Sequence, residues 1–265
     1  MLQRWLAVRP GPGCLVVLVI ALLGAGLLIL GSLGVLTPAQ MASAQSKMPK
    51  EEFEQRVRAY LLEHPEVIAE ALQRLELREQ AAQASAAKSV LKARADEILR
   101  DPESPVGGNP LGDVTLVEFF DYNCPYCRQV AGPMEEAAKG DPKLRIVYKE
   151  FPILGPDSTF AAKAALAAHR QGKYVTLHKA LMETKGKVTE KTVLDAAGQL
   201  GLDMKRLKAD MADPAIQAHI DRNLALARAL QINGTPSFVI GEQIVPGAVD
   251  LATLERLIAE ARAKK

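Results

Sequence analysis

Two cysteines, Cys124 and Cys127, form a Cys-x-x-Cys pair, a motif that can exchange disulfides, hold a metal ion or close a structural bridge. A zinc site needs two further ligands. The third cysteine, Cys14, lies in an apolar segment, and the four histidines lack zinc-site spacing. A disulfide across so short a loop would restrict the unfolded chain little. Redox chemistry is therefore the favoured interpretation, and the sequence predicts no metal site and no cofactor.

The residues around this pair indicate a strand, a tight turn and a helix. The run 114–120 is almost continuously apolar, which is typical of a central strand covered on both faces. Asp121 and Asn123 are turn and N-cap residues. Cys124 is therefore expected at the N-terminus of a helix, where the helix dipole and free backbone N–H groups favour the thiolate. Cys127, one turn later, is expected to be less exposed.

A second motif, Thr235-Pro236, stands immediately before the short apolar run 237–240. A proline at the start of a strand is tolerated because it lacks a ladder partner there. It is also a position where a cis peptide bond can be built in. An ordinary turn proline remains the alternative.

Strands and helices that would position these motifs can be placed along the chain. Strands are predicted at 114–120, 144–151 and 237–240, with 243–245 closing a hairpin and Val106 in a short edge strand. Helices are predicted at about 125–139, 158–171, 173–184, 189–200, 203–211, 214–230 and 251–262. A helical block thus separates two halves of a sheet.

Residues 1–44 have the pattern of a targeting segment. Arg4 and Arg9 precede an uncharged apolar run from Cys14 to Leu36 that is long enough to span a bilayer. Residues 42–44, Ala-Ser-Ala, match a signal-peptidase site. The sequence leaves open a signal peptide cleaved after Ala44 and an uncleaved anchor that holds the chain to the membrane through residues 14–36. Either predicts a periplasmic or other extracytoplasmic location.

Residues 45–103 are predicted to form a helical stalk, broken at Pro65, with the catalytic domain at 104–265. Its amphipathic pattern requires a partner surface, which is either its own catalytic domain or a second copy of the chain. The candidate contacts of a homo-oligomer through residues 50–100 are Phe53, Val57, Leu61, Ile68, Leu72 and Leu75. A net charge of +2 among 33 basic and 31 acidic residues gives no reason to expect nucleic acid as a partner.

Phe119-Phe-Asp-Tyr-Asn-Cys-Pro-Tyr-Cys127 together with Gly234-Thr-Pro-Ser-Phe238 resembles the DsbA-like thiol–disulfide oxidoreductases. Residues 50–100 resemble the helical N-terminal region of a ScsC/Com1-like branch. The resemblance implies an α/β thioredoxin-like fold with a helical insertion. It also implies that Cys124 is the nucleophile and Cys127 the resolving thiol. Glu118 matches the family's buried acid, and Thr235 precedes a cis-proline, Pro236.

The expected partners are client proteins with thiols or disulfides and a membrane redox partner that reoxidises or reduces the cysteine pair. Common oxidases of this family carry Pro-His between the cysteines, whereas this sequence carries Pro125-Tyr126, so less thiolate stabilisation is expected. Thr235 is more similar to the isomerase and reductase relatives. The direction of electron flow therefore stays open between oxidase, isomerase and reductase. The alternative class is a non-catalytic scaffold that binds a soft metal such as Cu(I).

Overall fold

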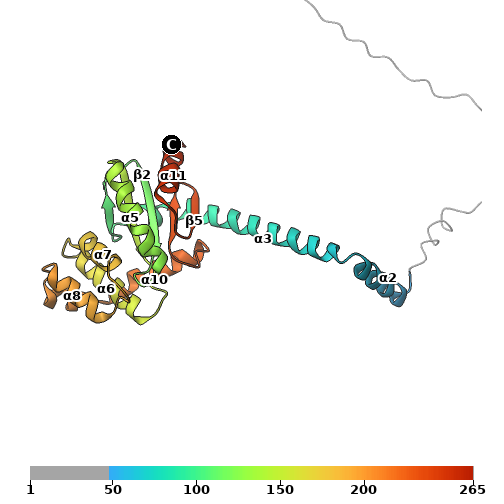
Figure 1. Ribbon diagram of the computed structural model, residues 1–265, viewed down its shortest axis with the longest axis horizontal. Helices are drawn as coiled ribbons and strands as arrows, with labels where there is room; N and C mark the ends of the chain where they lie inside the picture. The colour runs from blue at the N-terminus through green and yellow to red at the C-terminus, as the bar shows by residue number, and fades with distance from the viewer. Residues whose placement is uncertain (1–47, 265) are drawn as a thin grey trace, which may run out of the picture. The chain divides into compact units, whose positions relative to one another are not determined.

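The computed structural model describes residues 48–264, shown as a ribbon in Figure 1. They divide into two units between His64 and Pro65. The first contains helix α2 (Lys50–Glu63), and the second contains every other helix and strand described. Within residues 48–264, no helix combines the length and the apolar character needed to cross a membrane. The predicted targeting segment, 1–44, lies outside the described residues.

A five-stranded mixed sheet forms the centre of the second unit. Its strands are β1 (Val106–Gly108), β2 (Val114–Phe120), β3 (Leu144–Glu150), β4 (Ser237–Ile240) and β5 (Gln243–Pro246). Their order is β1-β3-β2-β4-β5; β2 and β3 are parallel, and the other neighbours are antiparallel. The predicted edge strand at Val106 and the hairpin after residue 240 are both confirmed.

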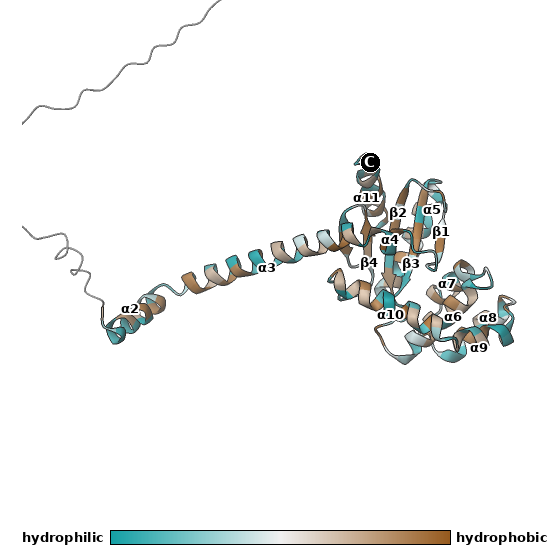
Figure 2. Ribbon diagram, turned by 180° about the vertical axis from the view of Figure 1, so that it is seen from behind, coloured by the Kyte–Doolittle hydropathy of each residue, from teal (hydrophilic) through white to brown (hydrophobic). Residues whose placement is uncertain are grey.

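Alternation along β2 divides the core into two clusters because successive side chains point to opposite faces. Leu116 and Phe120 belong to the larger cluster, with side chains of α5 (Pro125–Gly140) and α11 (Leu251–Ala263). Val117 and Phe119 belong to the smaller cluster on the other face. Figure 2 shows these central strands as largely hydrophobic, as expected for a sheet covered on both sides.

The chain between β3 and β4 forms the predicted helical block. Its helices are α6 (Pro156–His169), α7 (Tyr174–Met182), α8 (Glu190–Gln199), α9 (Met204–Met211) and α10 (Pro214–Ala229). All six alanines of α6 are buried, and their small side chains let neighbouring helices approach closely. Asp203 and Asp213 cap α9 and α10 through bonds from backbone N–H groups, which fixes where these helices begin.

The stalk region contributes to the core at its C-terminal end. Helix α3 (Glu66–Ala93) is followed at Arg94 by a separate short helix, α4 (Ala95–Leu99), where the sequence predicted one continuous helix. Leu91 and Ile98 from these two helices are buried in the smaller core cluster. The break turns the apolar side chains of both helices onto the sheet, and residues 91–99 therefore share the packing of the catalytic unit.

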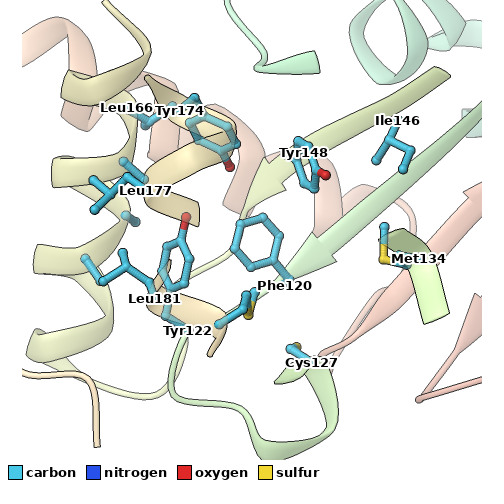
Figure 3. Packing of buried hydrophobic residues seen from close by; sticks show 14 of the residues in the cluster. Phe120, Tyr122, Cys127, Met134, Ile146, Tyr148, Leu166, Tyr174, Leu177 and Leu181 are labelled. Atoms are coloured by element: carbon cyan, nitrogen blue, oxygen red, sulfur yellow. The ribbon is translucent and has the colours of Figure 1, made fainter. Parts of the chain in front are cut away.

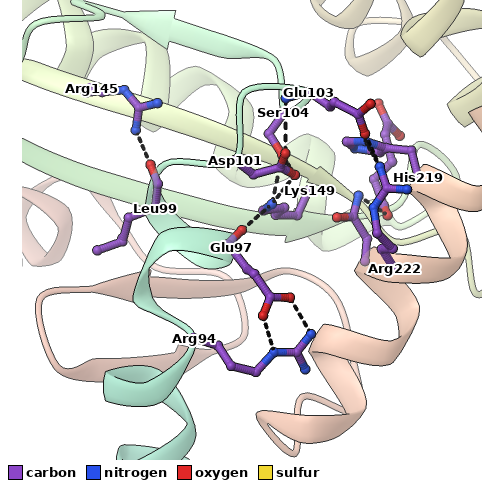
Figure 4. Close-up of polar contacts among 12 residues, drawn as sticks. Arg94, Glu97, Leu99, Asp101, Glu103, Ser104, Arg145, Lys149, His219 and Arg222 are labelled. Atoms are coloured by element: carbon purple, nitrogen blue, oxygen red, sulfur yellow. Dashed lines mark hydrogen bonds and ion pairs between the residues drawn. The ribbon is translucent and has the colours of Figure 1, made fainter.

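The side chain of Lys149, in β3, bonds to α4 and to the turn that follows it (Figure 4). Its side chain is only 1% exposed, and its ammonium lies 2.8 Å from the Glu97 carbonyl oxygen, 2.8 Å from Ser104 Oγ and 3.1 Å from Asp101 Oδ2. An ammonium group has three N–H donors, and these three acceptors use all of them. Burial lowers the pKa of Lys149, and Asp101 opposes that shift.

Replacing Lys149 with Met is expected to destabilise the protein by about 3 kcal/mol, because Asp101 keeps a partly buried charge whose partner is lost. The midpoint of urea unfolding measures the effect. Lys191→Met is the control, since the Lys191–Asp195 pair is exposed and such pairs contribute roughly 0–1 kcal/mol. Equal midpoints for the two variants would contradict this account of Lys149.

Candidate active site

Both cysteines lie where β2 leads into α5. Cys124 is the N-cap residue of α5, and Pro125 occupies the first turn. Cys124 is 4% exposed and Cys127 is fully buried, in agreement with the expected order of exposure. The two are free thiols in this structure. Cys124 therefore stands at the N-terminus of α5, the end of a helix at which the dipole favours negative charge.

The Thr235–Pro236 motif, although distant in the sequence, also lies beside Cys124. The peptide bond between these residues is cis. Strand β4 pairs with β2 so that Ser237 lies opposite Phe119, which carries the preceding loop to the end of β2. The Cys124 thiol donates to the Thr235 carbonyl oxygen at 3.2 Å.

Asp121 and Asn123 hold the loop between β2 and α5, but neither side chain caps the helix as the sequence analysis predicted. Asp121 accepts bonds from four groups: the backbone N–H groups of Asn123, Ile153 and Leu154 and the hydroxyl of Ser158. The Asn123 side chain bonds instead to Ser158 and to both backbone groups of Val188. The polar residues thus tie the cysteine loop to the helical block, and Cys124 takes the N-cap position.

Glu118 lies on the same face of β2 as Leu116 and Phe120, which is the face covered by α5 and Cys127. It is 2% exposed, and its Oε1 has no hydrogen-bond partner among the described residues. Burial raises the pKa of Glu118 to about 8. The carboxyl therefore gains or loses its proton near neutral pH, an unusual property that is typical of functional acids.

Cys127 differs from Cys124 in its surroundings. Burial raises the pKa of the Cys127 thiol, and the negative charge of Glu118 raises it further. Cys127 is therefore held as a thiol, and removing its proton requires a nearby base. Glu118 is the buried carboxyl whose charge acts on it.

Arg128 has a role that its place in the sequence did not indicate, whereas Tyr126 was noted above because it replaces the histidine of the Pro-His form. Arg128 donates to the carbonyl oxygens of Tyr122, Thr184 and Gly186, and so joins the start of α5 to the loop that follows α7. Tyr126, inside the motif, is 59% exposed and offers an aromatic surface next to Cys124. The sequence signal for Arg128 was its place one residue after the Cys-x-x-Cys motif. Its carbonyl partners are distant in the chain and cannot be read from the sequence.

A buried carboxyl, Glu150, organises a second polar cluster, and two members of that cluster, Tyr122 and Tyr174, are seen among the packed core side chains in Figure 3. It accepts bonds from the hydroxyls of Tyr122 at 3.0 Å and Tyr174 at 2.7 Å. The Tyr122 hydroxyl also lies 3.3 Å from Nδ1 of His178, whose pKa is lowered to about 3 by burial. Burial also raises the pKa of Glu150, so the cluster is close to neutral and compatible with the apolar core around it.

A family model for DSBA-like thioredoxin domains matches residues 115–259, more than half of the chain. The chain belongs to this family. A model for the N-terminal domain of copper resistance protein ScsC matches residues 50–82. Residues 115–259 therefore form a thiol–disulfide oxidoreductase domain of the DsbA type on a thioredoxin-like α/β fold, and the recognition of both regions from sequence is confirmed.

Solved structures of thioredoxin-like proteins support the same fold. A thioredoxin-like oxidoreductase from Silicibacter pomeroyi is 50% identical, with a TM-score of 0.62 over 63% of this chain and 97% of that one. A linker-deletion mutant of Proteus mirabilis ScsC is 29% identical, with a TM-score of 0.64 over 88% of this chain and 100% of that one. A periplasmic thioredoxin-like protein from Salmonella enterica is 32% identical, with a TM-score of 0.59 over 64% and 95%.

Among curated proteins, the chain is 30% identical to the Na(+)/H(+) antiporter NhaA of Herminiimonas arsenicoxydans over 165 residues. That match covers 61% of this chain but only 26% of the antiporter. The chain thus spans about a quarter of the length of this relative.

Replacing Glu118 with Gln is expected to change how stability depends on pH when the cysteines are reduced. The pKa of Glu118 is near 4.5 in the unfolded chain and about 8 in the folded protein, so the folded state holds a proton that the unfolded state has lost. Wild-type stability should therefore fall as pH rises from about 4.5 to about 8, and the variant should lack this part of the fall.

At about 1.4 kcal/mol per pKa unit, the difference between the two proteins should reach several kcal/mol above pH 8 and vanish below pH 4. Urea unfolding at a series of pH values measures it. Glu136→Gln, at an exposed position of helix α5, should follow the wild type. A constant difference between Glu118→Gln and wild type at every pH would contradict the raised pKa.

Proposed function

We propose that this protein is an extracytoplasmic thiol–disulfide oxidoreductase that exchanges disulfides with client proteins through Cys124 and Cys127. The observation that carries the proposal is the contact between the Cys124 sulfur and the Thr235 carbonyl, next to the cis bond to Pro236. This contact supports a site in which an extended client chain lies along the Thr235 loop beside the sulfur. Membership of the DSBA-like family supports the same chemistry.

In the reductive direction, the Cys124 thiolate attacks one sulfur of a client disulfide, forming a mixed disulfide and releasing the other client sulfur as a thiolate. The Cys127 thiolate then attacks the Cys124 sulfur and releases the second client thiolate. Two electrons have then passed from the cysteine pair to the client, which takes up two protons. The oxidative direction is the reverse, in which a client dithiol reduces the Cys124–Cys127 disulfide.

Glu118 is assigned the proton transfer that the second step requires. Cys127 is buried and its raised pKa keeps it protonated, so it cannot attack until a base accepts its proton. The buried carboxyl of Glu118, whose Oε1 has no hydrogen-bond partner among the described residues, has a pKa of about 8 and so a proton affinity suited to that task near neutral pH. Cys127 is then the resolving thiol and Cys124 the nucleophile.

An extracytoplasmic location is supported by the predicted targeting segment and by the periplasmic Salmonella protein that the fold resembles. An oxidising compartment is also where client disulfides persist. A membrane redox partner that renews the cysteine pair, and attachment through residues 14–36 if the segment is uncleaved, belong to the same proposal.

Replacing Cys124 with Ser should abolish disulfide exchange, whereas replacing Cys127 with Ser should trap client proteins as mixed disulfides, because the resolving thiol is lost. Insulin reduction measures the first effect, and non-reducing electrophoresis with mass spectrometry detects the second. Wild-type insulin reduction by the Cys124 variant would refute the proposed function. Adducts formed by both single variants equally would contradict the assignment of the nucleophile.

The stalk favours an isomerase over a solitary oxidase within this proposal. In α2, Phe53 is 57% exposed and Val57 is 39% exposed. In α3, the exposed fractions are 48% for Ile68, 56% for Leu72 and 52% for Leu75. Burying a side chain of this size contributes roughly 1.5–3 kcal/mol, so several per chain could hold a homo-oligomer together. Several active sites around one client would suit the breaking and re-forming of its disulfides.

Replacing Leu72 and Leu75 together with Glu should convert the homo-oligomer to a monomer, because four or more charges would be buried at the contact. Light scattering on the chain from residue 45 onward measures the molar mass. Leu111→Glu, at a 92% exposed position outside the stalk, is the control and should stay oligomeric. A wild-type monomer would contradict self-association and make the oxidase mode the better assignment.

A further inference from the structure

A groove of about 570 Å³ runs beside the Thr235–Pro236 bond, with one wall supplied by helix α3. Gln80, Gln83, Ala84 and Ala87 form this wall, and the chain from Leu230 to Ser237 forms much of the other. The groove lies within the second unit, where both walls belong to the same body.

The four α3 residues recur at the spacing of one helix face, i, i+3, i+4 and i+7. This face carries two glutamines and two alanines, so it lacks the large apolar side chains of a face that packs on a core. Three of the four are exposed, and Ala87 is half-buried. Packing therefore does not explain the composition of this face.

Every side chain that lines the groove is uncharged. The amides of Gln80 and Gln83 make no hydrogen bond within residues 48–264, and the opposite wall adds the amides of Gln231 and Asn233. An amide side chain both donates and accepts, so it can bond to the N–H and C=O groups of a polypeptide backbone whatever its sequence. The two alanines leave room for that backbone to approach.

The helix is fixed where it forms this wall. Lys88 pairs with Glu242, in the turn between β4 and β5, at 2.8 Å, and Leu91 is buried one turn later. At the other end, the groove includes Thr235, whose carbonyl contacts the Cys124 sulfur. A polypeptide lying in the groove would therefore be continuous with the site of attack.

We propose that residues 80–87 of α3 bind the extended segment of a client polypeptide that flanks the cysteine joined to Cys124. The uncharged side chains of this face bond to the backbone of the client, so the face accepts clients of varied sequence. This inference rests on the proposed function and adds to it a binding surface in the stalk helix, outside the region matched by the DSBA-like family model.

The test compares two disulfides with the same leaving group, using the full chain with its cysteines reduced. One is bis(2-hydroxyethyl) disulfide, which is too short to enter the groove. The other is an uncharged peptide of about ten residues, roughly 33 Å when extended, whose one cysteine forms a mixed disulfide with mercaptoethanol. Ala84→Trp fills the groove, and Ala86→Trp places the same ring on the opposite side of α3 as the matched control.

Ala84→Trp should lower the rate constant for the peptide about tenfold or more, as expected when several contacts are lost, with the small disulfide unaffected. Ala86→Trp should react with both as the wild type does. The double variant Gln80→Ala, Gln83→Ala, which adds no bulk, should slow the peptide alone by a smaller factor.

An Ala84→Trp variant that reduces the peptide at the wild-type rate would overturn the inference. Loss of both reactions would also overturn it, because α3 would then be needed by the cysteine site and not by the client. Unchanged peptide reduction with an altered molar mass would assign this face to a second copy of the chain. Failure of the wild type to reduce either disulfide would instead refute the proposed function.

Discussion

The antiparallel pairing of β2 with β4 is the constraint on which the site depends. In this register Ser237 lies opposite Phe119, so the residues just before β4 and those just after β2 must meet at one end of the sheet. Cys124 and Thr235 are thereby brought into contact although they are 111 positions apart. A shift by one residue would turn every side chain of β4 to the other face and move the proline loop away from the sulfur.

The polar residues around the cysteines secure this arrangement from the side of the helical block. Asp121 accepts bonds from the chain that follows β3 and from α6, and Asn123 bonds to the backbone at Val188. The two residues thus close the loop against elements that lie far along the chain. The block therefore does more than cover the sheet, because it fixes the position from which α5 begins. Glu150 extends the same connection through Tyr122 and Tyr174.

Much of the fold could be predicted because its signals are local. The apolar run 114–120, the proline after Cys124 and the regular spacing of the helices each fix an element with little reference to the rest of the chain. The cysteine pair and Pro236 were found for the same reason. The sequence did not predict the roles of three polar residues, Asp121, Asn123 and Arg128. Their partners are carbonyl and N–H groups that only tertiary contacts bring near. The separation of α3 from α4 likewise depends on where Leu91 and Ile98 find a core.

The aromatic residues are distributed so that intrinsic fluorescence can report on the active site. Its single tryptophan, Trp5, lies in the predicted targeting segment, so a chain cleaved after Ala44 would emit only through its tyrosines. Of the five tyrosines, Tyr122, Tyr148 and Tyr174 are packed around His178, and Tyr126 lies within the cysteine motif itself. Ultraviolet emission from such a chain would therefore arise mainly at the active-site loop and its contact with the helical block. Changes in the oxidation state of the pair could be followed there without attaching a dye.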